Sequence, residues 1–103
     1  MKTIPHWING QYYEGSPTGR FEVENPGTGD IEAELLQASD ADLDHAVDVA
    51  RRAQKEWARV PLAKRTAIMF RMRQLVLDHQ DEMARMIVAE HGKNYSDAVG
   101  EIQ

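Results

Sequence analysis

The stretch "LQASDADLDHAVDVARRAQKEWARVP", residues 36–61, marks the point where the chain changes from strand to helix. Ser39 or Asp40 is the predicted N-cap, and acidic residues fill the first turn that follows. Apolar residues then recur at the spacing of one helical face, until Pro61 ends the segment and suits the first turn of a new helix. The members of this face are Leu43, Ala46, Val47, Ala50, Ala53, Trp57 and Ala58.

A second apolar stripe follows Pro61 and predicts another helix. The stripe comprises Ile68, Met69, Met72, Leu75 and Val76, and Met83, Ile87 and Val88 continue it. The polar run "DHQDE", residues 78–82, predicts a break or kink with solvated caps, and Gly92 is typical of a helix end. We expect the two main helices to form an antiparallel hairpin, with Trp57 and Met72 in the core. Ser96 and Asp97 are expected to open a short final helix.

The residues before Ser39 have the pattern of short strands joined by turns. In "HWINGQYYEG", residues 6–15, strand-forming residues flank Asn9-Gly10, the pair typical of a type I′ hairpin turn. "FEVEN" alternates, with Phe21 and Val23 on one face, and "NPGTGD" is punctuated as a loop. "IEAELLQA" resumes as a strand until Ser39 interrupts it.

The predicted fold is therefore α+β, with a β hairpin and strands over residues 1–38 and helices over residues 39–103. An isolated hairpin is marginal in water, and a helix of about two turns is too short to be stable by itself. Both ends thus require partners that the chain does not supply. We expect a fragment of a larger protein, with self-association through exposed strand edges and apolar faces, chiefly at Trp57, Ile68, Met72 and Ile87.

The charge is unevenly distributed along the chain. Residues 51–73 hold eight of the twelve basic residues and a single acid, Glu56, although the net charge of the chain is −5. A basic stretch can bind nucleic acid. The stronger interpretation is a helix with acids in its first turns and bases in its last, which the helix dipole favours by about 0.3–1 kcal/mol each. We therefore predict no nucleic-acid partner.

No chemistry that could operate within these residues alone is visible. The chain has no cysteine, which excludes disulfides, thiolate metal ligands and a cysteine nucleophile within it. The glycines of "NPGTGD" form neither a dinucleotide fingerprint nor a phosphate loop, and His6, His45, His79 and His91 are too scattered for a metal set. We predict no catalytic, cofactor-binding or metal-binding residue here. With no apolar run that could span a bilayer and no signal core, a cytoplasmic location is predicted.

Several weak signals occur in an informative order. An "ING" hairpin is followed by "NPGTGD", by "AVDVARRAQKEW", by an arginine-led helix and by "EHGK" with an alanine and a glutamate after it. In this order they resemble the start of an aldehyde dehydrogenase. "HWING", "RTAIMFRMRQLV" and "EHGKNYSDAVGE" are similar to the methylmalonate-semialdehyde dehydrogenase branch. "NPGTGD" departs mildly from the commoner "NPATGE", since Asp30 keeps the acid.

The resemblance implies a parent with a Rossmann-type α/β fold, of which residues 1–103 would be the incomplete N-terminal part of the NAD-binding domain. It implies NAD and CoA as cofactors of the parent, none for the fragment, and a small semialdehyde as substrate. The catalytic cysteine, the general base and the nucleotide-binding residues would all lie beyond this chain. In that branch "GE" leads to an arginine and a glycine, so an arginine is expected after Gln103.

The resemblance also implies a structural cation site, whose matching positions are Val23, Glu24 and Glu90. Glu90 is equally well explained as a surface acid in the last turn of a helix. A second function stays open beside the dehydrogenase fragment, namely a small non-catalytic interaction module descended from such an enzyme. A third is a nucleic-acid binder that uses residues 51–73, which would show steeply salt-dependent binding.

Overall fold

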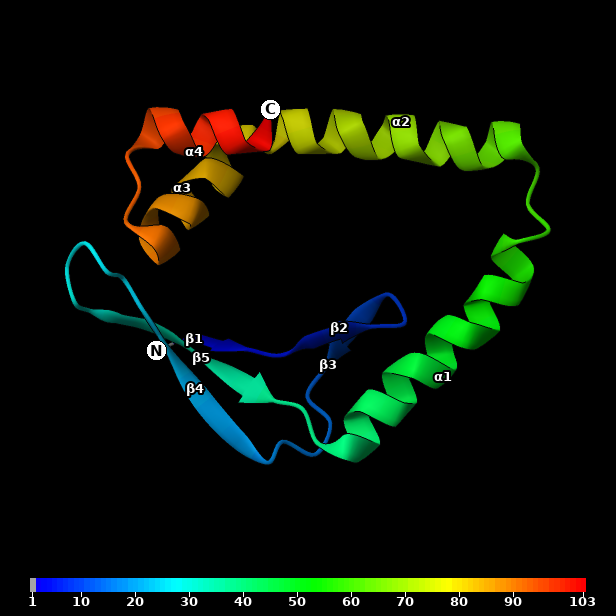
Figure 1. The fold of residues 1–103 in the computed structure, drawn as a ribbon, viewed down its shortest axis with the longest axis horizontal. Coiled ribbons are helices and arrows are strands. Elements are labelled where there is room, and N and C mark those ends of the chain that lie inside the picture. The colour runs from blue at the N-terminus through cyan, green and yellow to red at the C-terminus, as the bar shows by residue number, and fades with distance from the viewer. Residues whose placement is uncertain (1) are drawn as a thin grey trace. The chain divides into compact units, whose positions relative to one another are not determined.

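The computed structural model describes residues 2–103 and contains five strands and four helices over that range (Figure 1). The strands are β1 (Lys2–Ile4), β2 (His6–Ile8), β3 (Gln11–Tyr13), β4 (Gly19–Glu24) and β5 (Ile31–Gln37). The helices are α1 (Asp40–Trp57), α2 (Leu62–Asp78), α3 (Gln80–His91) and α4 (Tyr95–Ile102). They fall into two compact units. The first comprises the described residues up to Val23 together with Ile31–Arg59, and the second comprises Glu24–Asp30 and Val60–Gln103.

The first unit contains the predicted hairpin. β2 and β3 pair in antiparallel register, with Trp7 opposite Tyr12. Asn9 and Gly10 have φ values of 57° and 75°, the two positive angles that a type I′ turn requires. The prediction for this turn is therefore confirmed.

The first unit also contains a sheet that the sequence did not reveal. β1 pairs in parallel with β5, and the strand order is β1-β5-β4 (Figure 1). Some of the strands expected to lack partners are thus paired within the chain. A parallel pair joins segments about thirty residues apart, so no local pattern announces it. Ala33 and Leu36 of β5 are buried, whereas Phe21 of β4 is 55% exposed.

α1 begins as predicted. Ser39 is its N-cap, and Ser39 and Asp42 form a reciprocal capping box. The ring of Tyr13 stacks on His45, with ring centroids 4.9 Å apart, and so joins β3 to α1.

The second unit confirms the predicted helix boundaries at two places. The helical run breaks at His79, between α2 and α3, and Gly92 ends α3 in the left-handed conformation with φ 70°. α4 begins slightly earlier than expected, because Asn94 caps it through a hydrogen bond from the Asp97 amide. The predicted antiparallel pairing of α1 with the following helix stays a prediction, since the two belong to different units.

The apolar stripes of both long helices lie largely at the surface of this chain. Trp57 is 37% and Met72 is 60% exposed, so the prediction that they are core residues is wrong for residues 2–103. α2 contains no buried residue at all. Their periodicity indicates a face that packs against another element, but it does not say whether that element lies in the same chain.

Candidate functional site

Asp42 is the most connected polar residue of the first unit. It is 3% exposed, and its carboxylate accepts hydrogen bonds from the Ser16 amide, at 3.0 and 3.2 Å, and from the Ser39 amide, at 3.0 Å. It thereby ties the loop before β4 to the start of α1. Gly15, with φ 63°, lies so close that a Cβ atom there would be 2.2 Å from Asp42 Oδ1.

The amide hydrogen bonds from Ser39 and Ser16 lower the pKa of the Asp42 carboxyl, because they stabilise its charged form. Asp42 therefore stabilises the fold above the ordinary carboxyl pKa, and this contribution is lost as the pH falls through its lowered pKa. The role is structural, since its hydrogen bonds are with backbone amides of its own unit and with the capping hydroxyl of Ser39.

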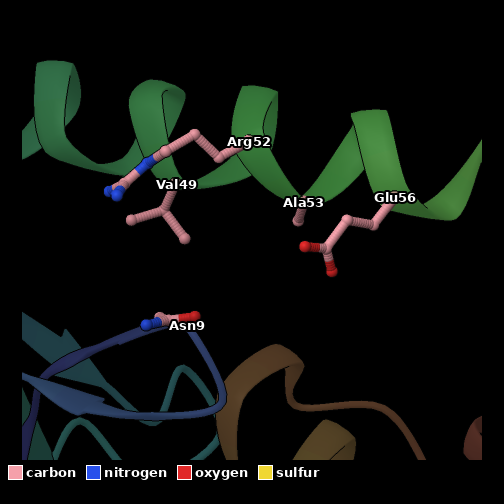
Figure 2. Close-up of a pocket in the computed structure, with 5 residues that line it drawn as sticks. All are labelled: Asn9, Val49, Arg52, Ala53 and Glu56. Carbon is pink, nitrogen blue, oxygen red and sulfur yellow. The ribbon is translucent and has the colours of Figure 1, made fainter.

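A shallow depression lies between the hairpin turn and α1 in the first unit (Figure 2). Its volume is about 360 Å³. The lining residues are Asn9, Val49, Arg52, Ala53 and Glu56. Arg52 is already bound by Asp48, whose Oδ2 lies 2.9 Å from its Nη2. The remaining walls offer one amide and one carboxylate, so the depression lacks the convergent polar groups of a cofactor site.

A second polar cluster joins α3 to α4 in the second unit. The hydroxyl of Tyr95 donates to Asp81 Oδ1 at 2.6 Å, and Arg85 Nε donates to Asp81 Oδ2 at 2.9 Å. The Arg85 guanidinium also lies over the Tyr95 ring, 5.9 Å from its centroid. Each of the three side chains therefore contacts the other two, and together with Val88 they line a hollow of about 490 Å³.

These contacts shift the pKa values of all three groups in the directions expected of a charged Asp81. The hydrogen bonds from Tyr95 and Arg85 lower the pKa of Asp81, and the bonds to Asp81 raise the pKa of both Arg85 and Tyr95. The cluster is complete at neutral pH. It weakens as the pH falls through the lowered pKa of Asp81 or rises through the raised pKa of Tyr95.

The segment "EHGK" lies at the junction of α3 and α4. Lys93 forms an ion pair with Glu101 of α4, which lowers the pKa of the Glu101 carboxyl. Gly92 packs against the "NPGTGD" loop, since a Cβ atom at Gly92 would be 3.1 Å from Pro26 Cγ. The last turn of α4 is therefore joined to the segment before that helix, and the loop lies against the end of α3.

The positions implied for a structural cation are Val23 and Glu24 at the end of β4 and Glu90 in the last turn of α3. Val23 is half-buried and both glutamates are exposed. Over residues 2–103, no three His, Cys, Asp or Glu side chains converge to hold a metal. The predicted absence of a metal-binding residue stays a prediction, and the cation at these positions stays only what the resemblance implies.

The hydrogen bonds of the "NPGTGD" loop show whether its backbone amides are free to bind a phosphate. Gly27 N bonds Asn25 Oδ1 at 2.9 Å, and Gly29 N bonds the Asn25 carbonyl at 2.7 Å. Asn25 N in turn bonds the Asp30 carbonyl at 2.8 Å. The amides that could have faced a pyrophosphate are already used within the loop, so the loop does not fit a dinucleotide.

The largest apolar surface of the second unit belongs to α2. Ile68, Met69, Phe70, Met72 and Leu75 are between 47% and 69% exposed. A groove of about 460 Å³ runs between this helix and the end of α4. Its lining residues are Met69, Met72, Arg73, Val76, Leu77, Ile102 and Gln103. Exposed apolar side chains in this number on one helix mark a surface for contact with further polypeptide.

The roles of Asp42, Asp81 and Tyr95 were not predicted from the sequence. The only local signal for Asp42 is its place among the acids of the first turn after the Ser39 or Asp40 N-cap, and this does not indicate the bonds from Ser16, 26 residues away. Asp81 was placed among solvated caps at the helix break. No sequence signal predicted that Tyr95, fourteen residues later, would reach it.

None of the helices within residues 2–103 combines the length and the apolar character that crossing a lipid bilayer requires.

Comparison with known proteins places this chain among enzymes much longer than itself. The sequence model of the aldehyde dehydrogenase family matches residues 12–103. Malonate-semialdehyde dehydrogenase 3 of Geobacillus kaustophilus is 44% identical over 99% of this chain. The chain spans only 21% of the length of that relative.

Solved structures agree with this match. The methylmalonate-semialdehyde dehydrogenase of Oceanimonas doudoroffii superimposes with a TM-score of 0.95 and 42% identity, over all of this chain and 21% of its own. An NAD-dependent benzaldehyde dehydrogenase of Corynebacterium glutamicum gives a TM-score of 0.90 and 39% identity, over 95% of this chain and 21% of its own.

Proposed function

Because this chain belongs to the aldehyde dehydrogenase family, we propose that it forms the N-terminal part of an NAD-dependent, CoA-acylating dehydrogenase of malonate or methylmalonate semialdehyde. The observation that carries the proposal is the 44% identity over nearly the whole chain to an enzyme named for malonate semialdehyde. The proposal includes NAD and CoA as cofactors, malonate or methylmalonate semialdehyde as substrate, and a cytoplasmic location.

In such an enzyme residues 2–103 act as scaffold. The amides of the "NPGTGD" loop are bonded within the loop and so are not free to bind the phosphates of NAD. The depression beside Asn9 has no convergent polar groups that could bind CoA. The apolar face of α2 supplies a surface on which the nucleotide-binding sheet of the enzyme would pack. The thiolate that attacks the aldehyde must come from another part of the enzyme, because this chain has no cysteine.

The proposal is tested with the full-length enzyme. Malonate semialdehyde, NAD and CoA together should yield NADH and an acyl-CoA, and omission of CoA should stop release of the acyl group as acyl-CoA. Turnover of uncharged aldehydes with no use of malonate or methylmalonate semialdehyde would overturn the substrate assignment.

The 103-residue chain by itself should neither reduce NAD nor bind it. A ligand that binds the native state raises its apparent stability, so NAD at up to millimolar concentration should leave the thermal unfolding temperature unchanged. Differential scanning fluorimetry and an absorbance assay at 340 nm check both statements. NADH formation above the blank, or a clear thermal shift with NAD, would contradict the scaffold role.

The isolated chain should also associate with itself. Ile68 and Met72 on α2 and Trp57 at the end of α1 are between 37% and 60% exposed, and covering them removes apolar surface from water. We expect dimers or larger species at high micromolar concentration in sedimentation equilibrium. Met72→Glu should shift the distribution toward monomer, whereas Glu56→Gln, in a polar hollow, should not. A monomer at these concentrations would contradict the prediction.

A further inference from the structure

The turn between β2 and β3 consists of an asparagine followed directly by a glycine, a reactive pair that the proposed function does not use. Asn9 and Gly10 are both exposed, and Figure 2 shows Asn9 at this turn. A Cβ atom added at Gly10 would meet nothing within 4 Å, so no neighbouring group crowds the residue after Asn9. The backbone nitrogen of Gly10 is therefore sterically open to the side chain that precedes it.

This pair can react without any enzyme, cofactor or oxidant. The Gly10 nitrogen attacks Cγ of Asn9 and loses its proton. The new N–Cγ bond closes a five-membered succinimide, while the Cγ–Nδ2 bond breaks and Nδ2 leaves as ammonia. Water then opens the ring at one of its two carbonyl carbons. Opening at Cγ gives aspartate, and opening at the backbone carbonyl gives isoaspartate, in which the main chain runs through Cβ and Cγ.

Ring closure requires the turn to leave its type I′ conformation, and the hairpin is weakly held at this end. β2 and β3 have three residues each, and no third strand of the described chain pairs with them. A two-stranded hairpin of this kind is marginal in water, so local opening costs little free energy. The stacking of Tyr13 on His45 ties the hairpin to α1, but Tyr13 lies at the end remote from the turn.

The other two asparagines differ from Asn9 in the residue that follows them. Asn25 precedes a proline, whose nitrogen carries no proton and cannot form the neutral ring. Asn94 is exposed like Asn9, but it precedes Tyr95, whose side chain crowds the attacking nitrogen. The Oδ1 atom of Asn94 also accepts a hydrogen bond from the Asp97 amide at 3.0 Å, which holds its side chain in the helix cap. Exposure alone therefore does not distinguish the three sites.

We propose that Asn9 is a site of spontaneous deamidation and that the isoaspartate formed there opens the hairpin. An isoaspartyl link adds one carbon to the backbone of a two-residue turn, and the length of that turn sets the register of the strands. The pairing of Trp7 with Tyr12, whose ring centroids are 5.0 Å apart, would then be lost. The fraction of molecules with an intact hairpin thus falls with the age of the protein.

The test follows the 103-residue chain during incubation in neutral buffer at physiological temperature. Trypsin places the three asparagines on separate peptides, residues 3–20, 21–51 and 94–103. Mass spectrometry detects the exchange of NH2 for OH, and tandem spectra assign it to Asn9 rather than to Gln11 of the same peptide. Rapid-quench hydrogen exchange over residues 6–13 reports the state of the hairpin before and after incubation.

We expect Asn9 to deamidate at least about tenfold faster than Asn94, which corresponds to a barrier lower by about 1.4 kcal/mol. Asn25 should stay unmodified. Exchange over residues 6–13 should quicken in the fraction of molecules that carries isoaspartate.

Two variants serve as controls, because Gly-Gly and Asp-Gly also suit a type I′ turn. Asn9→Gly cannot form the ring from its side chain, so its exchange over residues 6–13 should be the same before and after incubation. Fresh Asn9→Asp carries the added negative charge on an ordinary backbone, and it should be protected like the unmodified chain.

Equal rates at Asn9 and Asn94 would overturn the assignment of the site. Deamidation at Asn9 with unchanged exchange would overturn the effect on the hairpin, as would a fresh chain without protection over residues 6–13. Equal quickening in aged Asn9→Gly, or lost protection in fresh Asn9→Asp, would also overturn that effect, because the isoaspartyl link would then not be its cause.

Discussion

Replacing the arginine expected after Gln103 by leucine should lower kcat/KM for malonate semialdehyde by about 1.5–3 kcal/mol, or about 10–150-fold, the worth of a charged hydrogen bond. Malonate and methylmalonate semialdehydes carry a carboxylate at the end remote from the reacting carbonyl. A guanidinium binds a carboxylate through two parallel hydrogen bonds, and so fixes both its position and its orientation. The aldehyde is then presented to the nucleophile in one geometry.

This arginine would follow a helix, α4, that is anchored by several contacts. α4 is capped by Asn94, tied to α3 by Tyr95 and joined to the preceding turn by the Lys93–Glu101 ion pair. α4 ends at Ile102, and the amide of its C-cap Gln103 still bonds the Val99 carbonyl at 3.2 Å.

Steady-state kinetics on two substrates checks this prediction. Propanal lacks the carboxylate, so its kcat/KM should fall by less than about threefold in the leucine variant. Arg52→Leu is the matched control, since that side chain forms an exposed ion pair with Asp48 on α1, a kind of contact worth little. Equal losses for both substrates would remove the carboxylate-binding role, and with it the reason to prefer semialdehydes of this type.

Gly15→Ala should destabilise the chain more than the same substitution at Gly10 or Gly100. Gly15 has φ 63°, and a residue with a Cβ atom pays about 1–2 kcal/mol in the left-handed region. The added Cβ would also lie 2.2–2.8 Å from the carboxylate atoms of Asp42. Asp42 cannot move aside without losing its bonds from Ser16 and Ser39, so we expect overpacking to add about 1–3 kcal/mol.

The same substitution at the other two glycines separates the cost of the left-handed backbone from the cost of overpacking against Asp42. Gly10 has φ 75° but nothing within 4 Å of its added Cβ, so Gly10→Ala should show the backbone cost alone, about 1–2 kcal/mol. Gly100 lies in α4 with open space around it, so Gly100→Ala should stabilise the chain by about 0.5–1 kcal/mol.

Urea unfolding of the 103-residue chain, followed by circular dichroism at low micromolar concentration to limit association, measures all three free energies. Gly15→Ala should be the least stable variant and Gly100→Ala the most stable. If Gly15→Ala and Gly10→Ala lost the same free energy, the close approach of Asp42 to Gly15 would have no energetic consequence.

Much of the local structure could be predicted from the sequence, because each signal involves neighbouring residues. Asn9-Gly10 determines the hairpin turn, since few other pairs tolerate two positive φ angles. Ser39 and Gly92 set the start of α1 and the end of α3 for similar reasons of capping. The order of five short segments, from the "ING" hairpin to "EHGK", was also enough to identify the aldehyde dehydrogenase family, which the comparisons confirm.

The sequence also shows directly that the chain has no cysteine, so a cysteine thiolate cannot come from these residues. Which apolar side chains are buried could not be predicted from the sequence. The stripe that includes Trp57 and Met72 has the period of a packed helical face, yet these side chains are exposed in residues 2–103. Hydrophobic periodicity reports that a face is apolar, and only the arrangement of the elements around it decides whether the face is covered.

Tertiary structure alone decided the contacts that join distant segments. The β1–β5 pair, the bonds from Ser16 to Asp42 and the bond from Tyr95 to Asp81 link residues separated by about 31, 26 and 14 positions. Any of the many acids in the chain could have received the Ser16 amide or the Tyr95 hydroxyl as far as residue type is concerned. Asp42 and Asp81 do so because the folded backbone brings their carboxylates within hydrogen-bond distance, a geometric condition that neither propensity nor spacing along the chain encodes.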